Sequence, residues 1–370
     1  MKIVIDGRLY GLENAGLGRY LINLIDELTK LDVKNEYVIF LRKKYFDNLS
    51  LPANWKKVLV DIGHYTLAEQ IKLPGLIDRE KPDLTHFPHF NVPIFYRGKY
   101  VVTVHDMLMH KSIGLDATTL PAPLYFLKRL GYRLVFDNAI RCSTKIIAPS
   151  RTVKEELLEY YKIPEDKIYV TYEGVDAKII SNEGRKTTNP YFVYAGNAYP
   201  HKNLKRLIEA TIMLNKNSTQ LIKLMIASSR GIFTRRLEKI IKNLNADKYV
   251  ELLGFVSDEE LFKLYKNSVG FVFPSISEGF GLPGLEAMSS GTLVLASDTP
   301  IFKEIYKDNA VYFNPLDFTS IEEAMKNVLE MDSDLRSERI QKAKDFVKQY
   351  SWTKMAEETL KIYADSNSIR

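Results

Sequence analysis

Short apolar runs of strand length alternate with helical patterns along most of the chain, and this alternation constrains the fold more than any other feature. The run Tyr37–Leu41 is followed by others within residues 57–62, 83–87, 100–106 and 145–150. Continuous apolar runs are typical of parallel strands that are covered on both faces. Helical spacing separates several of these runs. Strand and helix in alternation predict an α/β fold built on doubly wound sheets.

A polar stretch at residues 181–190, SNEGRKTTNP, interrupts the series, and the same pattern restarts after it. A chain of 370 residues also exceeds what one ordinary core accommodates. We therefore predict two Rossmann-like domains, at 1–180 and 191–345, joined by a linker at 181–190 and facing a central cleft. The final residues, 346–370, are predicted to be helical. Ligands of such sheets bind beyond the carboxyl ends of the strands, so the loops after strands are expected to carry the function.

Composition excludes several classes of protein. The net charge of +6 and the pI near 8.9 suit an anionic ligand or a membrane surface, but they are too mild to indicate nucleic acid. Cys142 is the only cysteine, which argues against a disulfide framework and predicts a reducing, cytoplasmic location. The first residues lack the apolar run of a signal peptide, and no run approaches the ~18 residues of a spanning helix.

Two loops of the first half carry candidate residues. ENAGLGRYL follows the first strand, and Gly16 and Gly18 would allow a ligand close to the backbone at a helix N-terminus; a tight turn is the alternative. The full G-x-G-x-x-G spacing is absent, so a dinucleotide site is poorly supported. In VTVHDML, His105 could act as a general base or orient a substrate, or it could be structural, with Asp106 capping the next turn.

The first strand of the second half is followed by YAGNAYPHKNLKRLIEA. Lys202 lies where a helix begins, and its ammonium group would complement phosphate oxygens. A solvated lysine is the alternative. Asn203 is a candidate N-cap of the helix, and Arg206 lies one turn further on.

The stretch SEGFGLPGLEAMSSG, residues 277–291, places Glu278 after a strand and Glu286 in the first or second turn of a helix that begins near Pro283. Its glycines expose backbone N–H groups that can bind an anion, whereas two carboxylates need partners of another kind. A nucleotide sugar satisfies both, because its diphosphate takes the N–H groups and the lysine while its hydroxyls take the carboxylates. Stabilisation of the helix dipole would explain Glu286 alone, but neither Glu278 nor the glycines.

Together these motifs resemble the retaining glycosyltransferases of family 4, also called group 1 glycosyltransferases, which have the GT-B fold. The likeness covers nearly the whole chain. It includes AGLGRY, THFPHFNVP, VTVHD, IIAPSRTVKEEL, YEGVD, YAGNAYPHKNL, LLGFVSDEELFKLY, the E-x7-E stretch and the terminal YSWTKMAEETL. The order and spacing of these motifs are more specific than any one of them.

The resemblance implies a role for each matching position. The implied donor site comprises Glu286 on the ribose hydroxyls, Glu278 on the donor sugar, Lys202 on the diphosphate, His105 at the edge of the sugar, Gly16 facing the diphosphate, the backbone of Gly279, Phe280 and Gly281, and the segment Gly254, Phe255 and Val256 near the base. Asn197 stands where the family usually has arginine, which puts the two-cation clamp in doubt and leaves Arg206 as a candidate substitute. The terminal helix would cross back onto the first domain.

The resemblance also implies transfer with retention at the anomeric carbon. Lys202 and the glycine N–H groups would stabilise the leaving diphosphate, and the β-phosphate itself would take the acceptor proton. No Asp-x-Asp motif ends a strand, since DSD at 332–334 belongs to a polar segment. We therefore predict that the reaction needs neither a metal ion nor another cofactor.

The acceptor is expected to bind the first half. The forms PHKN and GLGRY look most like bacterial mannosyltransferases of polysaccharide or lipopolysaccharide assembly, which favours a mannose-like hexose. By this resemblance GDP-mannose is the expected donor. The residues themselves do not distinguish GDP, UDP and ADP as the carrier. Basic and aromatic residues interleave over 123–136, so this helix either lies on an anionic membrane or packs on its own sheet with solvated lysines. A membrane location, at the inner face of the cytoplasmic membrane, would favour a lipid-linked glycan as acceptor.

Two other functions remain open at this point. A nucleotide-sugar epimerase of the same fold would convert the donor without an acceptor. A non-catalytic subunit would bind a nucleotide sugar, although it would not need Glu278, Lys202 and His105 together.

Overall fold

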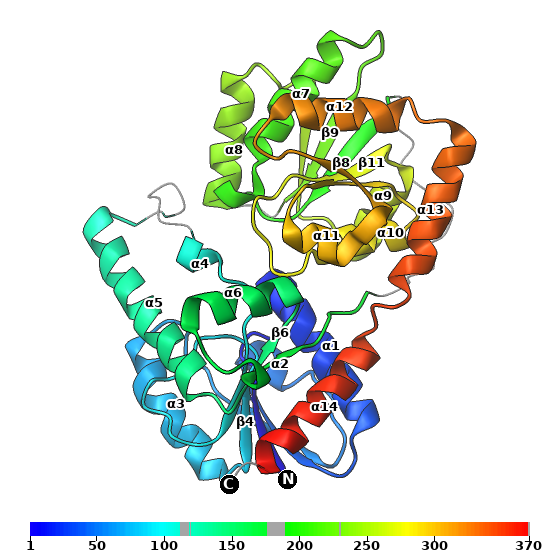
Figure 1. The fold of residues 1–370 in the computed structure, drawn as a ribbon. Helices are drawn as coiled ribbons and strands as arrows, with labels where there is room; N and C mark the ends of the chain where they lie inside the picture. Colours follow the sequence, from blue (N-terminus) through cyan, green and yellow to red (C-terminus); the bar gives the residue numbers. More distant parts are fainter. Residues whose placement is uncertain (112–117, 119, 176–188, 229–230, 369–370) are drawn as a thin grey trace. The chain divides into compact units, whose positions relative to one another are not determined.

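The computed structural model describes residues 1–111, 118, 120–175, 189–228 and 231–368, and it divides into two compact units (Figure 1). Unit 1 comprises Met1–Gly174 and Ser351–Arg370, and unit 2 comprises Val175–Tyr350. The chain thus passes from one unit to the other before the predicted boundary at residue 180. The predicted linker at 181–190 lies outside the described residues up to residue 188.

Unit 1 contains a sheet of seven strands in the order β3-β2-β1-β4-β5-β6-β7, and every pair in it is parallel. The strands are β1 Lys2–Asp6, β2 Glu36–Leu41, β3 Trp55–Leu59, β4 Leu84–Phe87, β5 Tyr100–Thr103, β6 Lys145–Ala148 and β7 Ile168–Val170. The chain runs outward from β1 to β3 and then returns to pair β4 with β1. The strand order therefore reverses at β1 and β4.

The helices of unit 1 connect these strands and cover the sheet. They are η1 Leu12–Asn14, α1 Ala15–Leu31, α2 Lys43–Phe46, α3 Leu67–Glu80, α4 Leu108–Lys111, α5 Ala122–Cys142, α6 Arg151–Tyr161, η3 Glu165–Lys167 and α14 Trp352–Ser368. Two of these helices begin at residues that favour the N-cap position: the side chains of Thr66 and Ser150 accept backbone N–H groups at the starts of α3 and α6.

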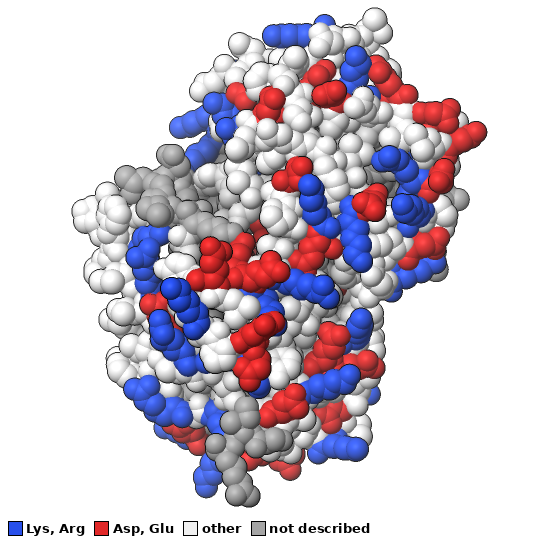
Figure 2. All heavy atoms as spheres, viewed as in Figure 1, with Lys and Arg blue, Asp and Glu red and all other residues white. Residues whose placement is uncertain are grey.

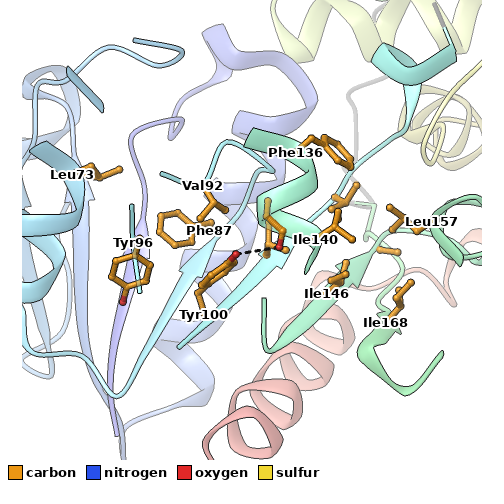
Figure 3. Packing of buried hydrophobic residues seen from close by; sticks show 14 of the residues in the cluster. Leu73, Phe87, Val92, Tyr96, Tyr100, Phe136, Ile140, Ile146, Leu157 and Ile168 are labelled. Carbon is orange, nitrogen blue, oxygen red and sulfur yellow. Dashed lines mark hydrogen bonds between the residues drawn. The ribbon is translucent and has the colours of Figure 1, made fainter. Parts of the chain in front are cut away.

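One hydrophobic cluster of unit 1 lies between the sheet and helices α3, α5 and α6 (Figure 3), and α1 and α14 bury further apolar side chains. Phe136 and Ile140 of α5 and Ile146 of β6 belong to this buried cluster, and Phe87 packs edge-on against Tyr100 with ring centroids 5.6 Å apart. The hydroxyl of Tyr100 donates to the carbonyl oxygen of Ala139 at 3.3 Å. Each such buried side chain stabilises the fold by roughly 1.5–3 kcal/mol relative to exposure.

The last helix packs against the first, because α14 and α1 lie side by side in unit 1 (Figure 1). Helix formation over the predicted segment 346–370 is interrupted, since α13 ends at Val347 and α14 begins only at Trp352. Ser351 provides a local reason, as its hydroxyl accepts the N–H of Lys354 in the manner of an N-cap. The Tyr363 hydroxyl bonds to Nδ1 of His86 in β4 at 2.6 Å, which fastens the chain end to the sheet.

Unit 2 contains a second parallel sheet, in the order β10-β9-β8-β11-β12-β13. Its strands are β8 Tyr191–Ala195, β9 Lys223–Ala227, β10 Val250–Gly254, β11 Gly270–Phe273, β12 Val294–Ser297 and β13 Ala310–Phe313. Its helices are η4 Pro200–Lys202, α7 Leu204–Lys216, α8 Ile232–Asn243, α9 Asp258–Asn267, α10 Leu282–Ser289, α11 Pro300–Tyr306, η5 Lys307–Asn309, α12 Phe318–Leu329 and α13 Ser333–Val347. Here the strand order reverses at β8 and β11. The α/β class with two doubly wound sheets is confirmed.

Candidate functional site

The strand order of unit 2 identifies where a ligand would bind. In open α/β sheets the crevice lies beyond the carboxyl ends of the two strands at which the order reverses. The loop after β8 carries Lys202, and the loop after β11 carries Glu278. These two predicted residues therefore come from the two sides of the reversal.

The structure brings Lys202 and Glu278 together as an ion pair. Lys202 Nζ donates to Glu278 Oε1 at 2.5 Å, and the two side chains are only 12% and 14% exposed. A backbone hydrogen bond from the N–H of Ile276 to the carbonyl of His201 joins the two loops at 2.9 Å. Burial lowers the pKa of the adjacent His201 to about 4, and the charge of Lys202 acts in the same direction. The cation and the carboxylate were predicted to serve different parts of a ligand, and here each satisfies the other.

The turn that presents Lys202 is held by Asn203. Asn203 lies in the left-handed region, with φ of 58°, and its side-chain amide donates to the carbonyls of Pro274 and Pro315 at 3.1 and 2.7 Å. Asn203 occupies the N-cap position of α7, as predicted, but its side chain makes no cap bond, because its amide holds the loops of Pro274 and Pro315 instead. Arg206 Nη1 donates to Asn203 Oδ1 at 3.0 Å, which places the candidate second cation on the residue next to Lys202.

Asn197 is engaged within its own loop. Its Oδ1 accepts the N–H of Tyr199 at 3.4 Å, and its carbonyl accepts the hydroxyl of Tyr194 at 2.7 Å. The side chain is half-buried and carries no charge. Arg206 is therefore the better placed of the two for contact with an anion.

The glycines before α10 have two different tasks. Gly281 has φ of 98° at the position before the helix, and its carbonyl accepts the hydroxyl of Tyr306 at 2.5 Å. A Cβ on Gly284 would overlap that same tyrosine, so packing alone requires a glycine there. The Phe280 side chain is buried against Tyr350, with ring centroids 5.8 Å apart. What the segment from Gly279 to Gly281 can offer a ligand is therefore its backbone.

Glu286 lies in the second turn of α10 and is 7% exposed. Pro283 occupies the first turn, as predicted from the missing N–H of proline. At the edge strand β10, Gly254 has φ of 75° and is followed by Phe255, which is 77% exposed, and by the half-buried Val256. An exposed aromatic ring after a strand offers a flat surface of the kind that a nucleobase stacks on.

Three buried hydroxyls at the same edge of the sheet were not found from the sequence. Ser228, Ser275 and Thr299 follow β9, β11 and β12, and their Oγ atoms have no hydrogen-bond partner within the described part of the chain. Buried polar atoms are normally paired, so unpaired ones beside a candidate site are available to a bound ligand. No motif marks these serines and threonines, since a hydroxyl after a strand is common.

The corresponding reversal in unit 1 places the loop after β1 beside the loop after β4. Helix α1 begins at Ala15, so Gly16 and Gly18 belong to the helix itself. Gly18 is required by packing, because a Cβ there would overlap the carbonyl oxygen of Gly11. A Cβ on Gly16 would meet no described atom within 4 Å, so its surroundings are open. Of the two glycines, Gly16 is the one that can face a ligand.

His105 follows β5 and is held from three sides. Its Nε2 lies 3.1 Å from the carbonyl oxygen of Pro88, and its Nδ1 lies 3.4 Å from Glu173 Oε1. The ring of Tyr20 packs edge-on against it at 4.8 Å. Because a carbonyl can only accept, Nε2 carries a proton and the imidazole has a fixed orientation. Glu173 belongs to the YEGVD motif, but no role could be assigned to it before its contact with His105 was known.

Asp106 caps the next turn, since its Oδ1 accepts the N–H of Leu108 at 2.9 Å. This local bond confirms the structural role for Asp106. Between residues 1 and 368, in the parts that are described, no cluster of three or more histidine, cysteine, aspartate or glutamate side chains could hold a metal ion. Nor does any described helix have the length and apolarity needed to cross a bilayer.

Comparison with known proteins gives consistent results for both units. Residues 175–346 match the family model described as Glycosyl transferases group 1, and residues 15–179 match the model of Glycosyltransferase Family 4. The chain is 26% identical over 368 residues to O-antigen chain mannosyltransferase RfbU of Salmonella typhimurium, which covers 95% of this chain and 97% of that protein. It is 24% identical, over an alignment of 390 residues, to O-antigen chain mannosyltransferase B of Escherichia coli, with 98% and 99% covered.

Solved structures show the same fold. Sucrose-phosphate synthase from Thermosynechococcus elongatus matches over 100% of both chains with a TM-score of 0.79 and 17% identity. The two family models together span residues 15–346. The chain therefore belongs to the group 1 glycosyltransferases of family 4, and its fold is the GT-B fold.

Proposed function

We propose that this glycosyltransferase moves a hexose, with mannose favoured, from a nucleotide diphosphate sugar to a glycan or lipid-linked glycan during polysaccharide or lipopolysaccharide assembly. One observation carries the proposal: the Lys202–Glu278 pair at the strand reversal of unit 2, next to the left-handed Gly281 that opens α10. A cation and the N-terminus of a helix suit a diphosphate, and a carboxylate suits sugar hydroxyls. The names of the two mannosyltransferase relatives support mannose as the sugar and a cell-surface polysaccharide as the product.

In this proposal the ion pair is the resting state of the donor site. The diphosphate displaces Glu278 from Lys202, since two phosphate groups offer the ammonium more negative charge than one carboxylate. Glu278 then accepts hydrogen bonds from the donor sugar, and the neighbouring Arg206 adds a second positive charge. Glu286 accepts from the ribose hydroxyls, and Phe255 lies where the base would bind. The residues predicted for separate parts of the donor thus exchange one partner for another on binding.

The chemistry is transfer with retention. The acceptor hydroxyl attacks the anomeric carbon on the face that the diphosphate leaves, the bond from that carbon to the β-phosphate oxygen breaks, and the oxygen keeps the electron pair. The acceptor proton passes to the phosphate. Lys202 and the N–H groups at the start of α10 stabilise the charge that develops on the leaving group. His105, fixed by Pro88 and Glu173, orients the sugar, and no metal ion is required.

The experiment is a donor panel tested with and without acceptor. Purified enzyme is incubated with GDP-mannose, UDP-glucose and ADP-glucose, alone and with a lipid-linked or free glycan, and the product is examined by NMR. We expect transfer from GDP-mannose to give an α-linked product, which retains the configuration of the donor, at a rate that EDTA leaves unchanged. Conversion of the donor without acceptor would indicate an epimerase, and binding without turnover would indicate a non-catalytic subunit. An inverted product would contradict the mechanism, and loss of activity in EDTA would contradict metal independence.

The proposed donor and acceptor also predict where in the cell the enzyme acts. A lipid-linked acceptor and a nucleotide-sugar donor meet at the inner face of the cytoplasmic membrane, where we expect the enzyme to act. The fraction of activity recovered with membranes after cell lysis measures this.

A further inference from the structure

The loop after β4 carries a motif to which the donor site gives no role. In THFPHFNVP, His89 lies two residues beyond the end of β4, one of the two strands at which the order of unit 1 reverses. The side chain of His89 is half-buried. Ligands of open α/β sheets bind beyond the carboxyl ends of the strands at such a reversal. The surroundings of His89 are therefore where a ligand of unit 1 is expected.

The contacts of His89 fix its tautomer. Its Nδ1 accepts the backbone N–H of Asn91 at 3.4 Å, so the proton of the neutral ring lies on Nε2. That nitrogen lies 3.4 Å from the hydroxyl oxygen of Tyr65. Burial lowers the pKa of His89 to about 3, and the neighbouring His105 and His64 act in the same direction, so the ring is neutral at physiological pH. His89 therefore presents an uncharged N–H donor toward Tyr65.

Tyr65 is held at the surface in a conformation that side chains rarely adopt. Its φ is 60°, in the left-handed region, and the residue is 65% exposed. Its backbone N–H donates to Glu69 Oε2 at 2.8 Å, and the same oxygen accepts the side-chain amide of Asn91 at 2.5 Å. One carboxylate thus fixes Tyr65 directly and holds His89 through Asn91. Backbone strain of this kind is concentrated at ligand-binding sites, where the surrounding structure maintains it.

The charges beneath this pair of residues are compensated within the protein. Glu69 is fully buried, and its Oε1 accepts from Arg8 Nη2 at 2.6 Å. Arg8 also donates to Asp6 Oδ2 at 2.7 Å, so its guanidinium is paired with two carboxylates and offers no charge to an acidic ligand. Over the face of unit 1 that Figure 2 shows, lysine and arginine side chains are interspersed with aspartate and glutamate. Neither observation favours an anionic sugar.

We propose that Tyr65 and His89 form the acceptor subsite of unit 1 and that the sugar bound there is a neutral pyranose. The inference rests on the proposed transferase function and names the class of sugar that unit 1 recognises. The exposed ring of Tyr65 gives the C–H face of a pyranose a flat apolar surface, and its hydroxyl adds a polar contact. Glu69 acts as a positioning residue, because it holds both groups and is itself fully buried.

The distance between the two polar groups suits a bound hydroxyl. The 3.4 Å from His89 Nε2 to the Tyr65 oxygen exceeds the roughly 2.7–3.2 Å of a good N–H···O bond. A sugar hydroxyl can accept from Nε2 and donate to the Tyr65 oxygen, and each of the two contacts then has a normal length. Binding therefore replaces one weak hydrogen bond by two better ones.

The test is saturation-transfer NMR of the full-length protein with three methyl glycosides. Methyl α-mannoside and methyl α-glucoside are neutral, and methyl α-glucuronide differs from the glucoside only in its carboxylate. We expect saturation of at least one neutral glycoside and about ten-fold less of the glucuronide. Tyr65→Ala should remove the signal, whereas Tyr65→Phe and His89→Ala should each weaken binding about three- to ten-fold, as expected for one lost hydrogen bond. Tyr160→Ala is a matched control, because this tyrosine is 52% exposed on α6 of the same unit, and it should bind as wild type does.

Glycoside binding needs no turnover, so it tests the subsite even if the transferase proposal fails. With an active donor and acceptor, Tyr65→Ala and His89→Ala should raise the KM for the acceptor about ten-fold and leave the KM for the donor unchanged. Thermal unfolding checks the fold of each variant, and the exposed Tyr65 keeps the test decisive if His89→Ala does not fold. The proposal is overturned if no neutral glycoside binds the wild type, if Tyr65→Ala binds as well as wild type, or if the glucuronide is saturated as strongly as the glucoside.

Discussion

The ion pair between Lys202 and Glu278 can be tested from each side, by a variant of the glutamate and by a variant of the lysine. If the diphosphate replaces Glu278 as the partner of Lys202, then Glu278→Gln should tighten the binding of the free nucleoside diphosphate, because the lysine no longer has to be released. The same variant should lose turnover, since the neutral amide is a weaker acceptor for the donor sugar. Lys202→Ala should weaken the binding of the diphosphate and lower kcat/KM by about a hundred-fold or more.

Isothermal titration with the nucleoside diphosphate and steady-state kinetics with the full donor measure the two effects. Weaker diphosphate binding by the Glu278→Gln variant would contradict the exchange of partners. Wild-type turnover in the Lys202→Ala variant would remove the lysine from the mechanism. Lys303→Ala is a matched control, because this lysine of unit 2 forms an exposed ion pair with Asp298 and has no assigned role in the site.

Glu286 carries a prediction of its own. Its carboxylate is assigned to the ribose, so Glu286→Ala should weaken nucleotide binding about ten- to a hundred-fold, the usual worth of hydrogen bonds to a charged group. Glu323→Ala, at an exposed position on α12, should change nothing. Equal dissociation constants for wild type and Glu286→Ala, from titration with GDP, UDP and ADP, would refute the ribose assignment.

Residues differ in how well their partners can be foreseen. The sequence indicates Glu278, Glu286 and Lys202 because each lies in a short motif next to a predicted strand end. Glu173 and Tyr306 are missed, because what they contact is set by the fold: Glu173 follows β7 and meets His105 after β5, and Tyr306 of α11 bonds to Gly281 before α10. The sequence also does not show which glycines of this motif are needed for packing. Only the contact with Tyr306 in the folded chain distinguishes Gly284 from its neighbours.

At the scale of one element, α1 offers a comparison between two glycines. Gly18→Ala should destabilise unit 1 by about 1–3 kcal/mol, because the added methyl group overlaps the carbonyl oxygen of Gly11. Gly16→Ala adds the same methyl group where no described atom lies within 4 Å. Because alanine loses less conformational entropy in a helix than glycine, the free energy of unfolding of this variant should be unchanged or about 0.5–1 kcal/mol higher than that of wild type. If Gly16 faces the donor diphosphate, the same substitution should still reduce activity.

Chemical denaturation and steady-state kinetics of the two variants separate these effects. Full activity together with full stability in Gly16→Ala would remove this glycine from the donor site. A stable Gly18→Ala variant would contradict the packing contact.

The sequence predicts the helices and strands better than the residues at which they begin and end. The continuous apolar runs identify the parallel strands, and the strand–helix alternation gives the class of both sheets. Local periodicity does not locate the start of α14, where the Ser351 hydroxyl accepts the N–H of Lys354, and it does not show the close fit of Gly18 in α1 against Gly11. It also cannot pair α14 with α1 and β4, since His86 and Tyr363 are 277 residues apart. The resemblance to a family supplied the return of the terminal helix, which composition and periodicity did not.

For the molecule as a whole, the histidines of unit 1 link stability to pH. Burial lowers the pKa of His86 to about 3 and that of His110 to about 4. His110 lies in α4. The hydroxyl of Tyr161 in α6 donates to Asp137 in α5 at 2.7 Å, so it can only accept from His110 Nε2, at 2.9 Å. Nδ1 of His110 must then accept from the hydroxyl of Tyr132. This chain of bonds fits a neutral imidazole.

A histidine whose pKa is depressed by folding binds protons more readily in the unfolded chain, whose pKa is near 6.5. The free energy of unfolding of unit 1 should therefore be constant above about pH 7 and should fall between about pH 6.5 and 4, by roughly 1.4 kcal/mol per pH unit for each such histidine. Both tryptophans, Trp55 and Trp352, belong to unit 1, so their fluorescence during urea denaturation reports on this unit alone. In His110→Gln the amide can reproduce both hydrogen bonds without titrating, and the slope between pH 6 and 5 should decrease by the contribution of one proton, about 1.4 kcal/mol per pH unit. An identical slope in wild type and variant would show that His110 does not contribute to the pH dependence.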